Sequence, residues 1–197
     1  MFGKFLKKSN ETKKEADFNK SKIDWHLNES ILTFDTGKLF MHYYAPNQKV
    51  DKNNPAWQNQ GVFFWENDEH FDKKSLPDDF LSMETKLFLI QSIPDYIQVA
   101  AGKAMPWFGK PGGGTKYFFK YEDNPITLEE AHHLKIMKYV DVITITPDNI
   151  SILNDRDNYV FNLSDKVTYK DKEFYLNQQK VSIAELYHKS LLIVLKI

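Results

Sequence analysis

Residues 102–119 read Gly-Lys-Ala-Met-Pro-Trp-Phe-Gly-Lys-Pro-Gly-Gly-Gly-Thr-Lys-Tyr-Phe-Phe and contain five of the eight glycines in the chain. Residues 96–101, just before this stretch, and residues 116–121, at its end, are rich in aromatic and β-branched residues, which predicts two strands. Glycine allows positive φ and close approach of a ligand, and successive free N–H groups can bind an anion. The stretch therefore predicts either a phosphate- or dinucleotide-binding loop or a wide β-connection that reverses the chain.

A P-loop is the first motif to compare with this stretch. Gly109 and Gly114 have the separation of the two P-loop glycines, but that motif continues with Lys and then Ser or Thr, whereas here Thr115 precedes Lys116. A P-loop also needs a helix whose N-terminus faces the phosphate, and residues 116–121 favour a strand. The sequence argues against a P-loop nucleotide hydrolase.

The residues before the glycine-rich stretch predict more strands and a loop. Residues 32–44 place two β-prone runs around an Asp-Thr-Gly-Lys turn, which predicts a hairpin. Residues 46–60 are rich in Asn, Gln, Lys and Pro and predict a long surface loop. Short strands are expected at residues 61–65 and 86–93.

The residues after the stretch predict a helix, a series of strands and a final helix. An apolar stripe indicates a helix over residues 128–138, which carries His132 and His133. Further strands are expected at residues 140–146, 150–153, 159–163, 167–169 and 174–176. Ser182 precedes apolar residues at helix spacing, which predicts a helix over residues 183–197 that either packs on the sheet or binds a partner.

Charge and composition exclude several classes of protein. The chain has 26 basic and 27 acidic residues and a formal net charge of −1, which argues against a nucleic-acid-binding protein. It has no cysteine, so it has no disulfide, thiolate metal site or cysteine nucleophile. No apolar run approaches the roughly 20 residues of a membrane helix, and no standard signal peptide is predicted, which leaves a cytoplasmic location or a non-standard secretion route open. All of the basic residues except Arg156 are Lys.

Residues 104–117 resemble the signature loop of the tuberculosis necrotizing toxin (TNT) family, which reads aromatic-Gly-x-Pro-Gly-Gly-Gly-x-Gln-Tyr. The flanking segments agree in order. Lys-Ser-Leu-Pro at residues 74–77 resembles the family's Arg-Ser-Leu-Pro-Pro, residues 87–94 resemble the strand that follows it, and residues 126–139 resemble the short helix after the loop. Residues 61–64 are similar to a Gly-x-Phe-Leu segment, and the resemblance covers about residues 55 to 143.

The resemblance implies an α+β, strand-rich fold with short helices and a C-terminal β-plus-helix extension. We expect a TNT-like domain at residues 23–143 and an extension packed on it at residues 144–197. Residues 1–22 hold seven Lys and three acidic residues and form a basic leader, either a solvated tail or a contact for an anionic surface.

The resemblance also implies hydrolysis of the nicotinamide–ribose bond of NAD or NADP, as in bacterial toxins that act on other bacteria or on a host. No metal or redox cofactor is needed. Lys116 occupies the position of the family's catalytic Gln and Lys74 that of an Arg, so these two are the catalytic candidates and are expected to bind the diphosphate. The candidate substrate-binding residues are Trp107, Phe108, Gly112, Gly113, Gly114 and Tyr117. An immunity protein or other partner protein is also implied.

Two readings of the function stay open. One is the NAD glycohydrolase, and the other is a catalytically inactive TNT-like fold that binds a nucleotide or a protein. The acids nearest to the expected cleft in sequence are Glu66, Asp68 and Glu69, any of which would serve as a base or stabilise a cation. The spacing of the acids in residues 66–79 fits no calcium loop, and adjacent His132 and His133 do not have metal-clamp spacing. No metal site is predicted.

Overall fold

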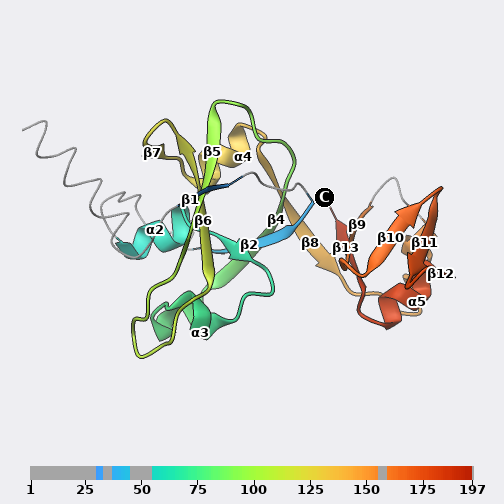
Figure 1. Ribbon diagram of the computed structural model, residues 1–197. Helices are drawn as coiled ribbons and strands as arrows, with labels where there is room; N and C mark the ends of the chain where they lie inside the picture. Colours follow the sequence, from blue (N-terminus) through green and yellow to red (C-terminus); the bar gives the residue numbers. More distant parts are fainter. Residues whose placement is uncertain (1–29, 33–36, 45–54, 155–158, 197) are drawn as a thin grey trace, which may run out of the picture.

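Three antiparallel sheets make up most of the computed structural model, which describes residues 30–32, 37–44, 55–154 and 159–196 (Figure 1). The four-stranded sheet has the order β1-β5-β6-β7, with bounds Ser30–Leu32, Ile97–Lys103, Thr115–Tyr121 and Asn124–Pro125. The six-stranded sheet has the order β3-β2-β4-β8-β13-β9, with bounds Trp65–Glu66, Leu39–Tyr44, Glu84–Ile90, Met137–Ile143, Leu192–Lys196 and Tyr159–Leu163. The three-stranded sheet has the order β10-β11-β12, with bounds Val167–Lys170, Glu173–Leu176 and Gln179–Val181.

The helices are short and lie between the strands. Their bounds are α2 Pro55–Gly61, α3 Phe71–Lys74, α4 Leu128–His133 and α5 Ile183–His188, with 3₁₀ turns η2 Asp78–Ser82 and η3 Ile150–Asn154. The α+β, strand-rich fold predicted from the sequence is confirmed. Within the described residues, no helix is long and apolar enough to span a bilayer.

An aromatic core joins the four-stranded and six-stranded sheets. Phe64 stacks on Phe119 of β6 at 4.9 Å between ring centroids and meets Phe40 of β2 and Phe88 of β4 edge-on at 5.3 Å each. All four rings are fully buried. Offset and edge-to-face ring pairs add to the free energy gained by burying the ring surface, so this cluster fixes β6 against β2 and β4.

Three predictions for the N-terminal half differ from the structure. Residues 32–44 do not form a hairpin, because β1 pairs with β5 while β2 pairs with β3 and β4. Five of the six residues of β2 are buried, as expected of a strand with neighbours on both sides. Residues 46–60 are not all surface loop, because α2 begins at Pro55 and buries Trp57. The strand expected at residues 61–65 lies later, at Trp65–Glu66, and Phe64 forms an isolated bridge with Tyr117.

The helix expected over residues 128–138 ends at His133. Thr127 caps its start, where its side chain accepts a hydrogen bond from Glu130 N–H and Glu130 bonds back to the backbone of Thr127. Lys135 then adopts a left-handed φ of 59°, and Met137 starts β8 beside Ile90 of β4. Because the turn reverses the chain into a strand, the apolar residues at 136 and 137 belong to the sheet.

The C-terminal segment also differs from its prediction. The helix expected over residues 183–197 stops at His188, and Leu192–Lys196 form β13 between β8 and β9. A continuous apolar run suits a central strand that is covered on both faces, which explains why its spacing also resembled a buried helix. The strand expected at residues 150–153 is the 3₁₀ turn η3. The basic leader at residues 1–22 lies outside the described residues.

Candidate active site

The glycine-rich loop connects β5 to β6 and is held by backbone hydrogen bonds. Gly113 N–H donates to Ala104 O at 2.8 Å, and Gly114 N–H donates to Lys73 O at 2.9 Å. A Cβ at Gly112 would lie 2.5 Å from Ala104 O, and φ there is +68°, so this position requires glycine. The N–H groups of Gly113 and Gly114 therefore already have partners within the protein. Close backbone packing explains the glycines at 112 and 114, whereas Gly113 has open space at its Cβ position and a φ of +87°.

A cavity of about 90 Å³ lies beside this loop. Its walls come from α2, the end of α3, η2, the glycine-rich loop and β6. The lining residues are Asn59, Lys74, Ser75, Pro77, Phe80, Ala104, Met105, Trp107, Phe108 and Lys116. Of the residues singled out in the sequence, Lys74, Lys116, Trp107 and Phe108 thus meet at one cavity, whereas Gly112, Gly113, Gly114 and Tyr117 do not line it.

Lys116 enters this cavity from β6 and is almost completely buried, with 3% of its surface exposed. Its Nζ donates to Asn59 Oδ1 at 2.8 Å and lies 4.5 Å from the ring centre of Phe63. Burial among these rings disfavours the charged form and lowers the pKa of Lys116 from its ordinary 10.5 to about 7. Near neutral pH, a large fraction of the molecules therefore carry an uncharged Lys116 amine that has a lone pair.

Lys74 is the second buried amine at this cavity. Its Nζ lies 3.4 Å from Met41 Sδ and 5.9 Å from the ring centre of Trp65, and Lys116 Nζ lies 5.7 Å from the same ring. Burial lowers the pKa of Lys74, and the negative charge of Glu69 partly offsets this effect. Two buried amines thus approach one indole ring.

Residues 45–140 match the family model described as tuberculosis necrotizing toxin. This segment belongs to that family. Among solved structures, the chain is similar to the tuberculosis necrotizing toxin complexed with its immunity factor, at 13% sequence identity and a TM-score of 0.45. That match covers 56% of this chain and 54% of the solved chain, so the chain spans about half of that protein's length. No curated protein sequence matches the chain.

The TNT-family segment presents two aromatic residues at the cavity. Trp107 is partly buried, and Phe108 is 54% exposed. Phe108 has a φ of 52°, in the left-handed region that is rare for a large side chain. An exposed ring held in a strained backbone conformation at a cavity is a candidate surface for stacking a flat ligand.

Two cavity-lining groups of the TNT-family segment were not singled out as site residues from the sequence. Ser75 Oγ is buried and has no hydrogen-bond partner among the described residues, and Ser75 has a left-handed φ of 52°. Asn59 contacts Lys116 from α2, a helix that the composition of residues 46–60 did not reveal. The Lys-Ser-Leu-Pro motif was the sequence signal for Ser75, whereas nothing local pointed to Asn59.

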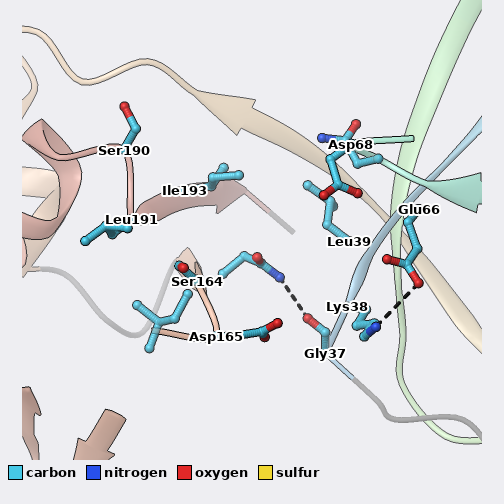
Figure 2. Close-up of a pocket in the computed structure, with 13 residues that line it drawn as sticks. Gly37, Lys38, Leu39, Glu66, Asp68, Ser164, Asp165, Ser190, Leu191 and Ile193 are labelled. Carbon is cyan, nitrogen blue, oxygen red and sulfur yellow. Dashed lines mark hydrogen bonds and ion pairs between the residues drawn. The ribbon is translucent and has the colours of Figure 1, made fainter. Parts of the chain in front are cut away.

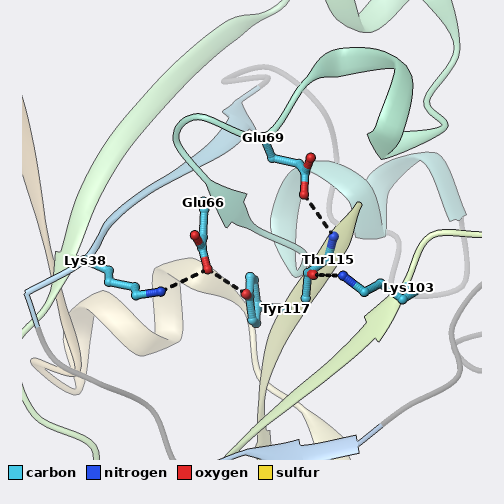
Figure 3. A network of polar contacts seen from close by, with 6 residues as sticks. All are labelled: Lys38, Glu66, Glu69, Lys103, Thr115 and Tyr117. Atoms are coloured by element: carbon cyan, nitrogen blue, oxygen red, sulfur yellow. Dashed lines mark hydrogen bonds and ion pairs between the residues drawn. The ribbon is translucent and has the colours of Figure 1, made fainter. Parts of the chain in front are cut away.

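Tyr117 of the TNT-family segment lies on the opposite face of β6 from Lys116. Its ring stacks on Phe64 at 5.5 Å, and its hydroxyl donates to Glu66 Oε1 at 2.8 Å (Figure 3). Burial, together with Glu66, raises the pKa of Tyr117. Lys38 Nζ lies 3.4 Å from the same carboxylate oxygen. Tyr117 is therefore part of the core and of a polar network at the sheet edge.

None of the three candidate acids is among the described residues that line the 90 Å³ cavity, although Glu69 raises the pKa of the cavity residue Lys74. Glu66 binds Tyr117, and Glu69 Oε2 accepts a hydrogen bond from Thr115 N–H at 3.2 Å (Figure 3). Asp68 lines a different and larger cavity of about 530 Å³ between the start of β2 and the residues around the end of β9 and the start of β13 (Figure 2). Asn162 bridges this second cavity by donating to Gly37 O at 2.8 Å. The residues that line the 90 Å³ cavity include no Asp or Glu.

His42, which precedes the TNT-family segment, and His132, which lies within it, both have structural surroundings. His42 is buried, with Nδ1 2.9 Å from Tyr43 O and Nε2 3.1 Å from Tyr139 Oη, and burial lowers its pKa. His132 contacts the ring of Tyr139 at 5.0 Å. No group of three or more His, Asp or Glu suited to hold a metal ion occurs in the part of the chain that the structure describes.

Proposed function

We propose that the chain is an NAD(P) glycohydrolase that hydrolyses the nicotinamide–ribose bond. The observation that carries this proposal is the cavity at which Lys74, Lys116, Trp107 and Phe108 meet, next to the signature loop of a toxin family. The reaction expels a leaving group that gains an electron pair on a positively charged nitrogen, so the enzyme mainly has to orient the substrate and stabilise a ribosyl cation.

The proposal divides the tasks among the side chains of the cavity. Lys74 attracts a phosphate of the dinucleotide in its charged form. Burial lowers the pKa of Lys74, and the negative charge of Glu69 partly offsets this effect and so favours the charged form. Phe108, and Trp107 beside it, offer rings on which the nicotinamide or adenine can stack. Ser75 Oγ supplies a buried hydroxyl with no partner among the residues that the structure describes, which suits a contact to a ribose hydroxyl or a phosphate oxygen.

Lys116 takes the place of the family's Gln next to the reacting carbon. A charged ammonium would oppose a developing ribosyl cation and has no lone pair to accept a proton. The low pKa of Lys116, caused by burial, removes both objections, since the neutral amine carries no charge and accepts a hydrogen bond. The lysine is therefore compatible with the chemistry, in contrast to what its charge in water would imply.

The alternative is a domain that binds the nucleotide without cleaving it. The absence of an acid among the residues that line the cavity favours this alternative, because glycoside hydrolysis commonly uses carboxylates to stabilise the cation and activate water. An immunity or other partner protein stays a prediction.

Nicotinamide release from NAD and NADP, measured by chromatography, tests the proposal. We expect release by the wild-type protein, and a loss of about 10- to 100-fold in kcat/KM for Lys74→Met, the usual effect of losing a hydrogen bond to a charged group. Lys138→Met, an exposed lysine on β8, is the matched control and should behave as the wild type. Calorimetric binding of NAD without release would favour the alternative, and neither release nor binding would refute both.

A further inference from the structure

Lys116 is placed as a nucleophile rather than as a surface cation. Its side chain is buried and lines the 90 Å³ cavity, with Nζ 2.8 Å from Asn59 Oδ1 and within 6 Å of the ring centres of Phe63 and Trp65. A lysine kept out of water in an apolar pocket, or near a second cation, loses its proton readily and becomes a nucleophile. For Lys116 it is burial among the rings of Phe63 and Trp65 that keeps the amine out of water.

The remaining residues of the cavity offer few competing groups. Among the described residues that line it there is no carboxylate, and the other polar side chains are the amide of Asn59, the hydroxyl of Ser75 and the amine of Lys74. In retaining glycosidases a carboxylate forms a bond to the anomeric carbon and so replaces an unstable cation by a covalent intermediate. An uncharged amine is a stronger nucleophile than an amide or an un-ionised hydroxyl and can form the same bond.

We propose that Lys116 Nζ attacks the anomeric carbon of the nicotinamide ribose and forms a covalent ribosyl-lysine intermediate. This inference rests on the proposed function. The cavity volume of about 90 Å³ equals that of a few water molecules, which fits the reacting edge of a sugar ring and leaves the rest of the dinucleotide outside, towards Phe108.

The proposed steps balance in atoms and charge. The lone pair of the amine forms the Nζ–C1 bond while the C1–nitrogen bond to nicotinamide breaks, and its electron pair neutralises the pyridinium. The new secondary amine releases one proton. The ribose ring opens as its ring oxygen gains a proton and Nζ and C1 form an imine. Water adds to the imine carbon, the C–N bond breaks, and ADP-ribose and free Lys116 are regenerated.

Burial explains why Lys116, among the 25 lysines of the chain, is the one expected to react. With a pKa of about 7, about half of the Lys116 side chains are uncharged at neutral pH, compared with about one in three thousand for a lysine of ordinary pKa. The supply of reactive amine at this position is therefore about a thousandfold larger than at a lysine of ordinary pKa.

Reductive trapping tests the intermediate. The full-length protein is incubated with NAD at neutral pH, with and without sodium cyanoborohydride, which reduces an imine to a stable secondary amine. Intact-mass and peptide analysis then locate any ADP-ribosyl adduct, and nicotinamide release is measured in the same samples. A parallel incubation uses ADP-ribose, whose open-chain aldehyde forms the same imine without cleavage of NAD.

We expect the adduct on Lys116 in the wild type and in Lys103→Met, which removes an exposed lysine from the neighbouring strand β5. We expect no adduct at position 116 in Lys116→Met. Nicotinamide release without an adduct, or adducts spread over exposed lysines, would overturn the covalent step and leave the glycohydrolase standing. An adduct from ADP-ribose without release from NAD would support the nucleophilic amine and refute the hydrolase, and the absence of both would refute both.

Discussion

Replacing Lys116 by Met should stabilise the protein, and the gain should depend on pH. The folded protein keeps this side chain buried, and burial lowers its pKa from 10.5 to about 7. Between these two values the unfolded chain holds a proton that the folded chain has lost, so the free energy of unfolding rises with pH. Below about pH 7 the folded protein bears the full cost of the buried charge, and above about pH 10.5 it bears none.

The pKa shift of Lys116 sets how much stability Lys116→Met should gain. Each pKa unit corresponds to about 1.4 kcal/mol, so the destabilisation by Lys116 is about 5 kcal/mol at low pH, about 4 kcal/mol at pH 7 and about 2 kcal/mol at pH 9. Methionine fills a similar volume and packs well against Phe63 and Trp65. Its substitution also removes the hydrogen bond to Asn59, worth about 1 to 2 kcal/mol. We therefore expect Lys116→Met to be more stable by about 2 to 3 kcal/mol at pH 7 and nearly equal to the wild type at pH 9.

Urea unfolding at pH 7, 8 and 9, followed by tryptophan fluorescence, measures this difference. Because every other titrating group is shared, the wild-type free energy of unfolding should rise by about 2 kcal/mol relative to that of Lys116→Met over this range. Lys138→Met, which changes an exposed lysine, should give a curve parallel to the wild type. Parallel curves for Lys116→Met and the wild type would refute the reasoning, because they would mean that Lys116 titrates equally in the folded and unfolded chains.

Four further substitutions test the packing of the glycine-rich loop, the cap of α4 and the core of the six-stranded sheet. Gly112→Ala should lower the free energy of unfolding by several kcal/mol, because its Cβ would lie 2.5 Å from Ala104 O. Gly109→Ala, at a position with a similar φ but open space, should lower it by only about 1 kcal/mol. Chemical denaturation of the two variants measures the difference. Thr127→Ala removes the cap of α4 and should cost about 1 to 2 kcal/mol in thermal unfolding, and an unchanged melting temperature would contradict the capping geometry. Leu195→Ala should cost about 2 to 5 kcal/mol, because this fully buried side chain belongs to a central strand, and a loss below 1 kcal/mol would mean that β13 is not integral to the sheet.

The strands near the glycine-rich loop could be predicted because their signals are local. The β-prone runs at residues 86–93 and 116–121 lie within three residues of the bounds of β4 and within one residue of those of β6. The pairing of β1 with β5, by contrast, joins Ser30 to Ala101, and a turn signal at residues 35–38 suggested a nearer partner. Sequence neighbours compete with distant strands for the same backbone groups, and which of them wins depends on packing that a local pattern does not contain.

Local sequence patterns also predict only part of the candidate site. Lys74 and Lys116 could be selected from the motif, but their burial could not, since lysine in a polar-looking stretch is usually exposed. Trp57 and Asn59 lie in α2, which a run of Asn, Gln and Pro concealed. The chemical character of Lys116 depends on rings supplied by residues 63 and 65, so it emerges only when the two sheets are packed together.

The choice of lysine over arginine has a physical consequence at this site. A guanidinium keeps its charge at every physiological pH, so an Arg in the place of Lys116 would bury a permanent cation beside Phe63 and Trp65. Lysine can release its proton instead, which limits the cost of burial and creates a lone pair. Lys74 is the residue that stands where the resembled motif has an Arg, and burial lowers the pKa of its amine while Glu69 partly offsets this effect. At both positions the charge of the side chain therefore depends on its surroundings, which a guanidinium would not allow.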